Sequence, residues 1–318
     1  MSLSEFELIA HYFSGGRFAV AGREDIVVSV GDDAAVIRPR PDHEQVVAID
    51  TLVEGVHFPA SMSPRDIGYR SLAVNLSDLA AMGARPLWFT LGLTMPDVRE
   101  GWLEGFSSGL AELAQPNDCA LVGGDTTRGP LTISVQVCGD VPQGQALLRT
   151  GARPGDLLFV SGYPGTAALG LQHVQAGHVE SQAAKTFLRP IPRLGLGQGL
   201  RALASAAIDI SDGLLADLGH IVDASGVGAE IDCAMLPRNR ALSELDRADA
   251  QFLQLKGGDD YELCFTVPPD RVGEVMEQAE ISVTPCHQVG RVIAGSGVTL
   301  NGALGDVGES GVAGYRHF

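Results

Sequence analysis

Short apolar runs alternate along the first half of the chain with longer stretches in which apolar residues recur at helical spacing. The runs predict buried strands at Val46–Ile49, which ends at Asp50, and at Leu87–Met95, Cys119–Val122 and Thr132–Val137. The stretches between them predict two helices, one from the N-cap Ser63 and Pro64 to about Met82, stopped by Gly83, and one from Val98 to about Ala114. Strands and helices are interleaved, which is typical of a mixed α/β fold.

The second half repeats this alternation after a turn-rich run at residues 149–156. Strands are expected at Leu157–Val160, Ala207–Ile210, Ala229–Ile231 and Tyr261–Val267, and helices at about Gly165–Ala176, Gly213–Ala224 and Pro269–Ala279. A chain of 318 residues is long enough for two domains of ~150 residues each. We place their boundary at the turn-rich run, which gives domains at 1–148 and 149–318 and a two-domain α/β (α+β) fold class.

Charge and composition narrow the function classes. The chain carries 22 Lys plus Arg against 39 Asp plus Glu, a net charge of −17. This balance argues against nucleic acid and against an anionic membrane surface as partners, because both attract basic faces. The N-terminus holds acids where a secretion signal needs basic residues, and no apolar run reaches the ~20 residues of a membrane span. Five scattered cysteines favour buried free thiols over disulfides or zinc, so we expect a cytoplasmic protein.

Aspartate is the more abundant acid, with 23 residues against 16 Glu, and it recurs beside glycine. Five segments combine the two residue types after an apolar strand: 31–35, 50–57, 123–129, 209–213 and 257–262. Glycine lets backbone N–H groups approach an anion, and carboxylates hold hard cations. The two lysines, Lys185 and Lys256, lack the neighbours of a Walker A loop, so a nucleotide site would need Mg²⁺ to offset phosphate charge. Turns and helix caps remain an alternative explanation for each single segment.

Asp78 lies inside the predicted helix that begins at Ser63, where Asn, Ser and Asp are poor helix formers. Asn75 precedes it by three residues, so the two side chains share a face. Either this face is solvated, or the helix presents a carboxylate to a metal cluster.

Three of these runs resemble the thiamine-monophosphate kinase family, of the aminoimidazole-ribonucleotide-synthetase-like superfamily. They are Asn75–Ala84, Gly123–Gly129 and Gly258–Leu263, and the resemblance extends from Phe6 to Phe318. It implies ATP-dependent phosphorylation of thiamine monophosphate to thiamine diphosphate, with several Mg²⁺ ions. Because the acceptor is a phosphate that is already mostly ionised at neutral pH, our hypothesis is direct transfer without a phospho-enzyme. It also implies a metal- and ATP-binding N-terminal domain whose strands pair across a homodimer into a β-barrel, and a C-terminal domain that closes the active site.

The resemblance also assigns residues to the site. The metal-binding acids fall on Asp33, Asp50, Asp78, Asp125, Asp209 and Asp212, and catalysis is assigned to Asp50, Asp78, Asp125 and Asp212. Nucleotide contacts fall on Gly124, Asp125, Arg149 and Ser211, and thiamine-phosphate contacts on His57, Asp259 and Tyr315. From the residues themselves, His57 could equally be an ordinary strand histidine and Tyr315 a surface aromatic.

Two positions depart from the family pattern, and other readings remain open. Ala48 and Ile49 replace a Ser-Thr pair, which removes two hydroxyl ligands, and Asp259 is one methylene shorter than the usual Glu.

Selenophosphate synthetase needs an early reactive cysteine, whereas the first here is Cys119; the hydrogenase-maturation relative ends in cysteine, whereas this chain ends in Phe318. The remaining alternatives are aminoimidazole ribonucleotide synthetase, whose acceptor is an amide oxygen, and a non-catalytic metal-nucleotide sensor.

Overall fold

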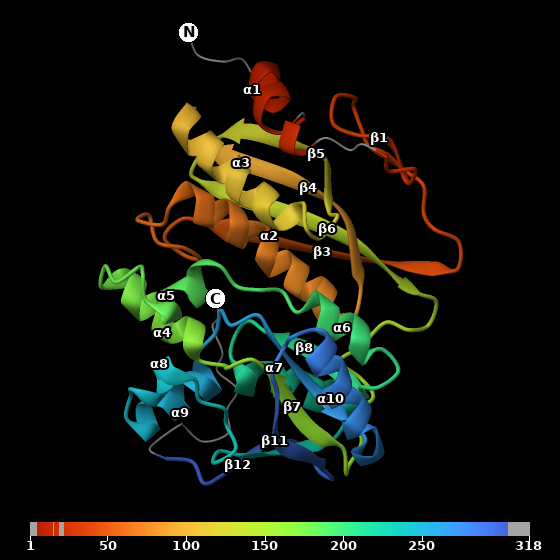
Figure 1. Cartoon of the computed structure of the whole chain (residues 1–318), viewed down its shortest axis with the longest axis vertical. Coiled ribbons are helices and arrows are strands. Elements are labelled where there is room, and N and C mark those ends of the chain that lie inside the picture. The colour runs from red at the N-terminus through yellow and green to blue at the C-terminus, as the bar shows by residue number, and fades with distance from the viewer. Residues whose placement is uncertain (1–4, 15, 19–21, 305–318) are drawn as a thin grey trace. The chain divides into compact units, whose positions relative to one another are not determined.

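The computed structural model describes residues 5–14, 16–18 and 22–304 (Figure 1). The chain divides into two compact units. Unit 1 comprises Met1–Leu79 and Ala84–Gly144, and unit 2 comprises Ala80–Gly83 and Gln145–Phe318. Each unit mixes strands and helices, as the alternating sequence pattern predicts. Among the described residues, no helix is both long and apolar enough to cross a membrane.

Unit 1 is built on a four-stranded sheet in the order β3-β6-β4-β5. β3 and β4 run antiparallel to β6, whereas β4 and β5 are parallel. A separate two-stranded sheet joins β1 and β2. The elements of this unit are α1 (Glu5–Tyr12), η1 (Gly16–Phe18), β1 (Ile26–Val28), β2 (Val36–Ile37), β3 (His43–Val53), α2 (Pro64–Ala81), β4 (Arg85–Met95), α3 (Glu100–Ala114), β5 (Ala120–Arg128) and β6 (Thr132–Pro142).

The helices α2 and α3 lie side by side across one face of this sheet (Figure 1). They approach closely because glycine stands at the crossing: a Cβ at Gly68 would lie 2.0 Å from the carbonyl oxygen of Phe106. The predicted start of α2 is confirmed, since the Ser63 hydroxyl accepts a hydrogen bond from the backbone N–H of Asp66 at 3.1 Å. Its predicted stop is confirmed as well, because Gly83 follows the helix with φ of +67°.

Unit 2 is built on a six-stranded sheet in the order β12-β9-β11-β7-β10-β8, in which only β12 and β9 pair in parallel. Buried apolar residues of β7, β8, β9 and α7 form its core. The elements are β7 (Leu157–Ser161), α4 (Thr166–Gln175), α5 (Gln182–Leu188), α6 (Leu194–Leu200), β8 (Ala206–Ile210), α7 (Leu214–Ser225), β9 (Gly228–Asp232), α8 (Arg240–Ser243), α9 (Arg247–Lys256), β10 (Glu262–Val267), η2 (Pro269–Arg271), α10 (Val272–Ile281), β11 (Cys286–Ile293) and β12 (Gly297–Asn301).

The structure corrects two predicted strand ends. Asp50 does not end its strand, because β3 remains paired with β6 as far as Val53. Asp125 does not follow a strand either: β5 continues through it to Arg128 alongside β4. Asp50 and Asp125 therefore lie within paired strands, where the backbone is hydrogen-bonded to a neighbouring strand on at least one side. Several elements were not predicted from the sequence, namely α1, β1, β2, α5, α6, α8, α9, β11 and β12.

The expected state of the cysteines is confirmed, since all five are buried and free. Burial raises the pKa of the Cys138 thiol to about 11 and that of Cys286 to about 12. Because the thiolate is the reactive form, we expect the native protein to resist thiol reagents, with no more than about one thiol per chain reacting before denaturation. Titration with a chromogenic disulfide, with and without guanidinium, measures this. Rapid reaction of several thiols in the native state would show that the burial is not maintained in solution.

Candidate active-site residues

A pocket of about 560 Å³ in unit 1 brings together three of the predicted residues, Asp33, Gly124 and Asp125. The pocket is lined by the 30–35 segment that connects β1 to β2, by residues of β4 and β5, and by Ile9 and Phe13 in and just after α1. Asp32 also lines the pocket and was not predicted; its carboxylate accepts the backbone N–H of Asp33 at 2.8 Å. The carboxylates of Asp32, Asp33 and Asp125 belong to exposed residues, so water reaches the site that they share.

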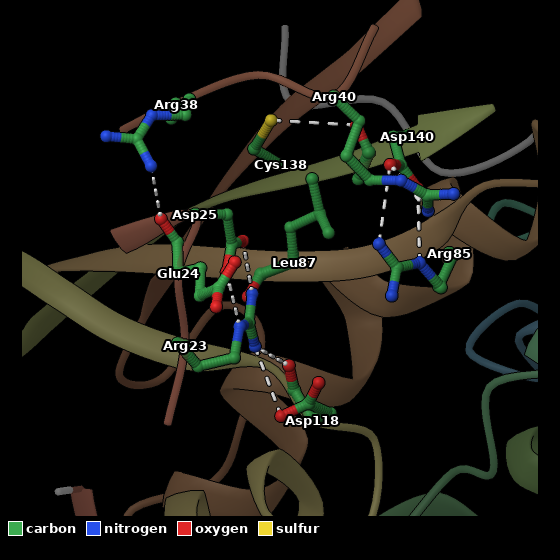
Figure 2. Close-up of polar contacts among 11 residues, drawn as sticks. Arg23, Glu24, Asp25, Arg38, Arg40, Arg85, Leu87, Asp118, Cys138 and Asp140 are labelled. Atoms are coloured by element: carbon green, nitrogen blue, oxygen red, sulfur yellow. Dashed lines mark hydrogen bonds and ion pairs between the residues drawn. The ribbon is translucent and has the colours of Figure 1, made fainter. Parts of the chain in front are cut away.

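Ion pairs lie before β1 and after β2, on both sides of the 30–35 segment along the chain (Figure 2). Before β1, Arg23 contacts both Asp25, at 2.7 Å, and Asp118, at 3.1 Å. After β2, Arg40 contacts the buried carboxylate of Asp140 at 3.2 Å. Asp118 lies just before β5 and Asp140 lies on β6, so these contacts tie the chain before β1 and after β2 to the region of the four-stranded sheet.

Gly124 allows β5 to approach β4 at the pocket. A Cβ at Gly124 would lie 2.0 Å from the carbonyl oxygen of Leu91, whereas one at Gly123 would meet no atom within 4 Å. We therefore expect Gly124→Ala to force the two strands apart and to destabilise the protein by about 1–3 kcal/mol. Thermal unfolding measures this, with Gly123→Ala as the matched control. Equal unfolding temperatures for the two variants would contradict the close approach.

Asp50 is held by Asn75, which lies three residues before Asp78 on α2. The side-chain carbonyl of Asn75, on α2, accepts the backbone N–H of Asp50, on β3, at 2.9 Å. Asn75 itself is fully buried, and its amide donates to the carbonyl oxygen of Ser71 at 3.0 Å. Of the twelve residues 70–81, Asp78 is the one that is not buried. The solvated-face alternative therefore does not describe this part of α2, because Asn75 is buried and Asp78 is a partly exposed acid between buried neighbours.

His57 lies in a turn after β3 and not in a strand, which corrects the alternative reading of this residue. Its Nδ1 accepts the backbone N–H of Val53 at 3.0 Å, so in the neutral ring the proton is on Nε2. Burial raises the pKa of Asp50, and the charge of His57 opposes this rise. Asp50 and His57 are thus close enough to influence each other electrostatically.

In unit 2, two predicted segments meet at the carboxyl end of β8. The carbonyl oxygen of Ser211 accepts the backbone N–H of Asp259 at 2.8 Å, and that of Ile210 accepts the N–H of Tyr261 at 2.8 Å. A Cβ at Gly258 would lie 2.4 Å from the Ser211 carbonyl, so glycine permits this contact. Asp259 has φ of +70°, a conformation that Asp tolerates better than most residues.

Asp209, Ser211 and Asp212 occupy the end of β8 and the loop before α7. Asp209 is buried at 5 % exposure and pairs with Leu263 of β10. Sequence reasoning missed Asp217, in the first turn of α7. Its Oδ2 accepts the backbone N–H groups of Ser211, Asp212 and Gly213 at 3.0, 3.0 and 3.1 Å. Burial, together with the charges of Asp209 and Asp212, raises the pKa of Asp217 to about 7.

Two further buried acids lie in the 257–261 loop and directly after it. Asp260 accepts the backbone N–H groups of Gly165, at 2.6 Å, and Ala167, at 3.0 Å, and so caps the start of α4. Burial raises the pKa of Asp260 well above its ordinary value. Glu262 forms a two-bond ion pair with Arg193, with distances of 2.7 and 2.5 Å, and accepts the Ser161 hydroxyl at 2.5 Å. These contacts fix both sides of the loop that carries Asp259.

Two of the predicted site residues remain, Arg149 and Tyr315. Arg149 is exposed, and its backbone carbonyl accepts the hydroxyl of Ser225 at 3.2 Å. Tyr315 lies outside the described residues. Within those residues, no group of three or more His, Cys, Asp or Glu side chains is arranged to hold a metal ion by itself.

Comparison with known proteins matches both halves of the chain. A family model described as AIR synthase related protein, N-terminal domain, matches residues 31–141, and its C-terminal counterpart matches residues 153–302. The thiamine-monophosphate kinase of Escherichia coli K12 is 50 % identical over 275 residues, which are 84 % of each chain.

Two solved structures are similar along most of their length. The thiamine-monophosphate kinase from Stenotrophomonas maltophilia K279a is 48 % identical with a TM-score of 0.85, covering 89 % of this chain and 93 % of that one. AaThiL complexed with AMPPCP and TMP is 31 % identical with a TM-score of 0.78, covering 91 % of this chain and 92 % of that one. The chain belongs to the thiamine-monophosphate kinase family.

Proposed function

We propose that the protein transfers the γ-phosphoryl group of ATP directly to the phosphate of thiamine monophosphate, giving thiamine diphosphate and ADP. The observation that carries this proposal is the 50 % identity with the Escherichia coli thiamine-monophosphate kinase, over 84 % of both chains. AaThiL, 31 % identical, binds AMPPCP, an ATP analogue, together with TMP, and this pair matches the two substrates proposed here. The named relatives favour this reaction over that of aminoimidazole ribonucleotide synthetase.

The acceptor chemistry suits the acids of the chain. A phosphate monoester has its second pKa near ~6, so thiamine monophosphate is already mostly ionised at neutral pH and needs no strong general base. The barrier is electrostatic, since two polyanions must meet with the attacking and leaving oxygens in line. Carboxylates cannot neutralise phosphate by themselves, so their abundance in the proposed site requires cations.

The acids of the unit 1 pocket fit Mg²⁺. This ion prefers oxygen ligands, keeps several waters, and is usually held by one or two carboxylates together with substrate phosphates. Asp33 and Asp125 line one water-accessible pocket, so two carboxylates are present for an ion that would also bind substrate phosphates. Mg²⁺ held by Asp33 and Asp125 would neutralise phosphate charge.

We assign the roles of the chain's own residues on this basis. Asp33, Asp50, Asp78 and Asp125 of unit 1 and Asp209 and Asp212 of unit 2 are proposed to hold several Mg²⁺ ions. Gly124, Arg149 and Ser211 are proposed nucleotide contacts, and His57, Asp259 and Tyr315 proposed thiamine-phosphate contacts. Asn75 and the hydrogen bond of His57 to Val53 would keep Asp50 and His57 in place before substrates bind.

The edge strand β3 of the unit 1 sheet supports the proposed homodimer. β3 is an edge strand, and its Val47 and Ile49 are 56 % and 63 % exposed. Exposed apolar edge strands invite pairing with another chain. We propose that a second copy covers this edge and that strands of both copies form the barrel; the open sheet does not close within one chain among the described residues. Sedimentation measures the oligomeric state, which is a dimer on this proposal.

We further propose a cytoplasmic location for the protein.

Transfer of a radioactive γ-phosphoryl group tests the proposed route. Incubation with labelled ATP, Mg²⁺ and thiamine monophosphate is expected to place the label in thiamine diphosphate, with none bound to the protein after rapid quenching. A protein-bound label that is then passed to thiamine monophosphate would overturn direct transfer. Label released only as inorganic phosphate would overturn the proposed acceptor.

A further inference from the structure

We propose that Asp217 is a positioning residue that holds the nucleotide- and metal-binding loop at residues 211–213 in its working conformation. The inference rests on the proposed function, because that function assigns Ser211 to the nucleotide and Asp212 to Mg²⁺. It concerns a residue that neither the sequence motifs nor the proposed ligand set include.

A single oxygen atom of Asp217 gathers three consecutive backbone donors. Its Oδ2 accepts the N–H groups of Ser211, Asp212 and Gly213 at 3.0, 3.0 and 3.1 Å. The residue is only 3 % exposed, so water does not compete for these bonds. Convergent backbone N–H groups before a helix form the kind of concave site that binds phosphate in many nucleotide-binding proteins. Here a carboxylate of the chain itself occupies that position.

Because Asp217 occupies the backbone donors, the loop must bind a nucleotide through other groups. Because the three N–H groups already bind Asp217, they are not available to a phosphate group. Ser211 and Asp212 must therefore act through the hydroxyl and the carboxylate of their side chains. The glycine of this segment permits the turn and does not serve to expose a phosphate-binding amide, since Gly213 has φ of +117° and its N–H is directed at Asp217.

The loop is held from the other side by the 257–261 segment, which donates to the carbonyl oxygens of Ile210 and Ser211 at 2.8 Å each. Asp217 thus holds the backbone N–H groups of residues 211–213, and the 257–261 segment holds the backbone carbonyl oxygens of Ile210 and Ser211. The base of α7 is rigid, since Leu214 and Leu218 are fully buried in the unit 2 core. Removal of the carboxylate would free the donors and let the side chains of Ser211 and Asp212 change direction.

Steady-state kinetics of Asp217→Ala and Asp217→Asn, with Asp223→Asn as the control, test this role. Asp223 is an exposed acid on the same helix. We expect Asp217→Ala to raise the KM for MgATP by about 10-fold or more, as loss of an outer-shell partner typically does. The KM for thiamine monophosphate should change much less, because Asp259, the proposed substrate contact that is bonded to this loop, meets the carbonyl oxygen of Ser211 and not the N–H groups that Asp217 holds. Asp217→Asn retains an acceptor oxygen and should recover part of the MgATP affinity, and Asp223→Asn should match the parent.

A merely structural role predicts a different result. It would lower the unfolding temperature and the yield of active protein while leaving both KM values unchanged, and that outcome overturns the proposal. If Asp217→Ala does not fold, Asp217→Asn decides: a rise of about threefold or more in the MgATP KM supports positioning, and an unchanged or equal shift in both KM values overturns it. Equilibrium binding of MgATP gives the same comparison without turnover. Failure of the parent protein to form thiamine diphosphate would instead contradict the proposed function.

Discussion

Asp125→Asn is expected to lower kcat for thiamine diphosphate formation by at least about 100-fold, which corresponds to about 2.7 kcal/mol of transition-state stabilisation. Asp125 is exposed in the pocket that also contains Asp33, and it projects from a strand paired with β4. Its replacement removes a proposed Mg²⁺ ligand without removing buried contacts. The fold should therefore be preserved, and the unfolding temperature should stay close to that of the parent.

The control for this prediction is Asp97→Asn, which makes the same change of charge in unit 1 at a side chain that is 61 % exposed. Asp97 does not line the pocket. We expect this variant to keep the kcat and the Mg²⁺ dependence of the parent. Comparable activity of Asp125→Asn and Asp97→Asn over a range of Mg²⁺ concentrations would remove Asp125 from the proposed metal site.

The largest effect on stability is expected at the ion pair of Arg193 with Glu262. The two side chains are 17 % and 9 % exposed, and Arg193→Met would leave the Glu262 carboxylate buried without its cation, although the Ser161 hydroxyl still donates to it. Removal of one member of a buried pair costs about 3–5 kcal/mol. For a domain of this size, that free energy lowers the unfolding temperature by roughly 6–20 °C. Calorimetry of the purified variants measures it.

A double variant separates the loss of an attraction from the cost of an unpaired charge. Arg193→Met combined with Glu262→Met leaves no isolated buried charge, so it should unfold at a higher temperature than Arg193→Met. Arg240 pairs with Glu244 at 3.5 Å on the surface, with 95 % of the Arg240 side chain exposed, and Arg240→Met should cost less than about 1 kcal/mol. If Arg193→Met and Arg240→Met are equally mild, the buried pair does not contribute as described.

Much of the fold could be predicted because local signals agreed with the tertiary structure. The cap at Ser63, the stop at Gly83 and the apolar run before Asp209 all describe the elements that form. The helix α6 could not be predicted, since three glycines in its seven residues oppose helix formation. It is stabilised by packing, as the close contact of Gly199 with the side chain of Gln278 on α10 indicates.

β11 escaped prediction for a different reason. Its sequence mixes polar residues with glycine, and its pairing with β7 shifts register between Gln288 and Gly290, so the alternation of buried and exposed positions is broken.

The predicted end of β3 was wrong because pairing with a partner extends a strand. β6 continues the pairing from Asp50 to Val53 whatever the local pattern favours.

The candidate site, like the fold, could be predicted only in part. Aspartate beside glycine identified Asp33 and Asp125, which the structure brings to one pocket. The sequence could not identify Asp217, because an acid in the first turn of a helix is an ordinary feature, and only the folded backbone directs three N–H groups at it. Asn75 was noted as the neighbour of Asp78, yet its hydrogen bond to Asp50 depends on how α2 meets β3.

The stoichiometry of the products tests the central claim most directly. Purified protein is incubated with ATP, Mg²⁺ and thiamine monophosphate, and thiamine diphosphate, ADP and inorganic phosphate are quantified by chromatography. The proposed reaction predicts equal amounts of thiamine diphosphate and ADP, with inorganic phosphate at background and no turnover after Mg²⁺ is chelated. ADP and inorganic phosphate in equal amounts without thiamine diphosphate, or no turnover at all, would contradict it.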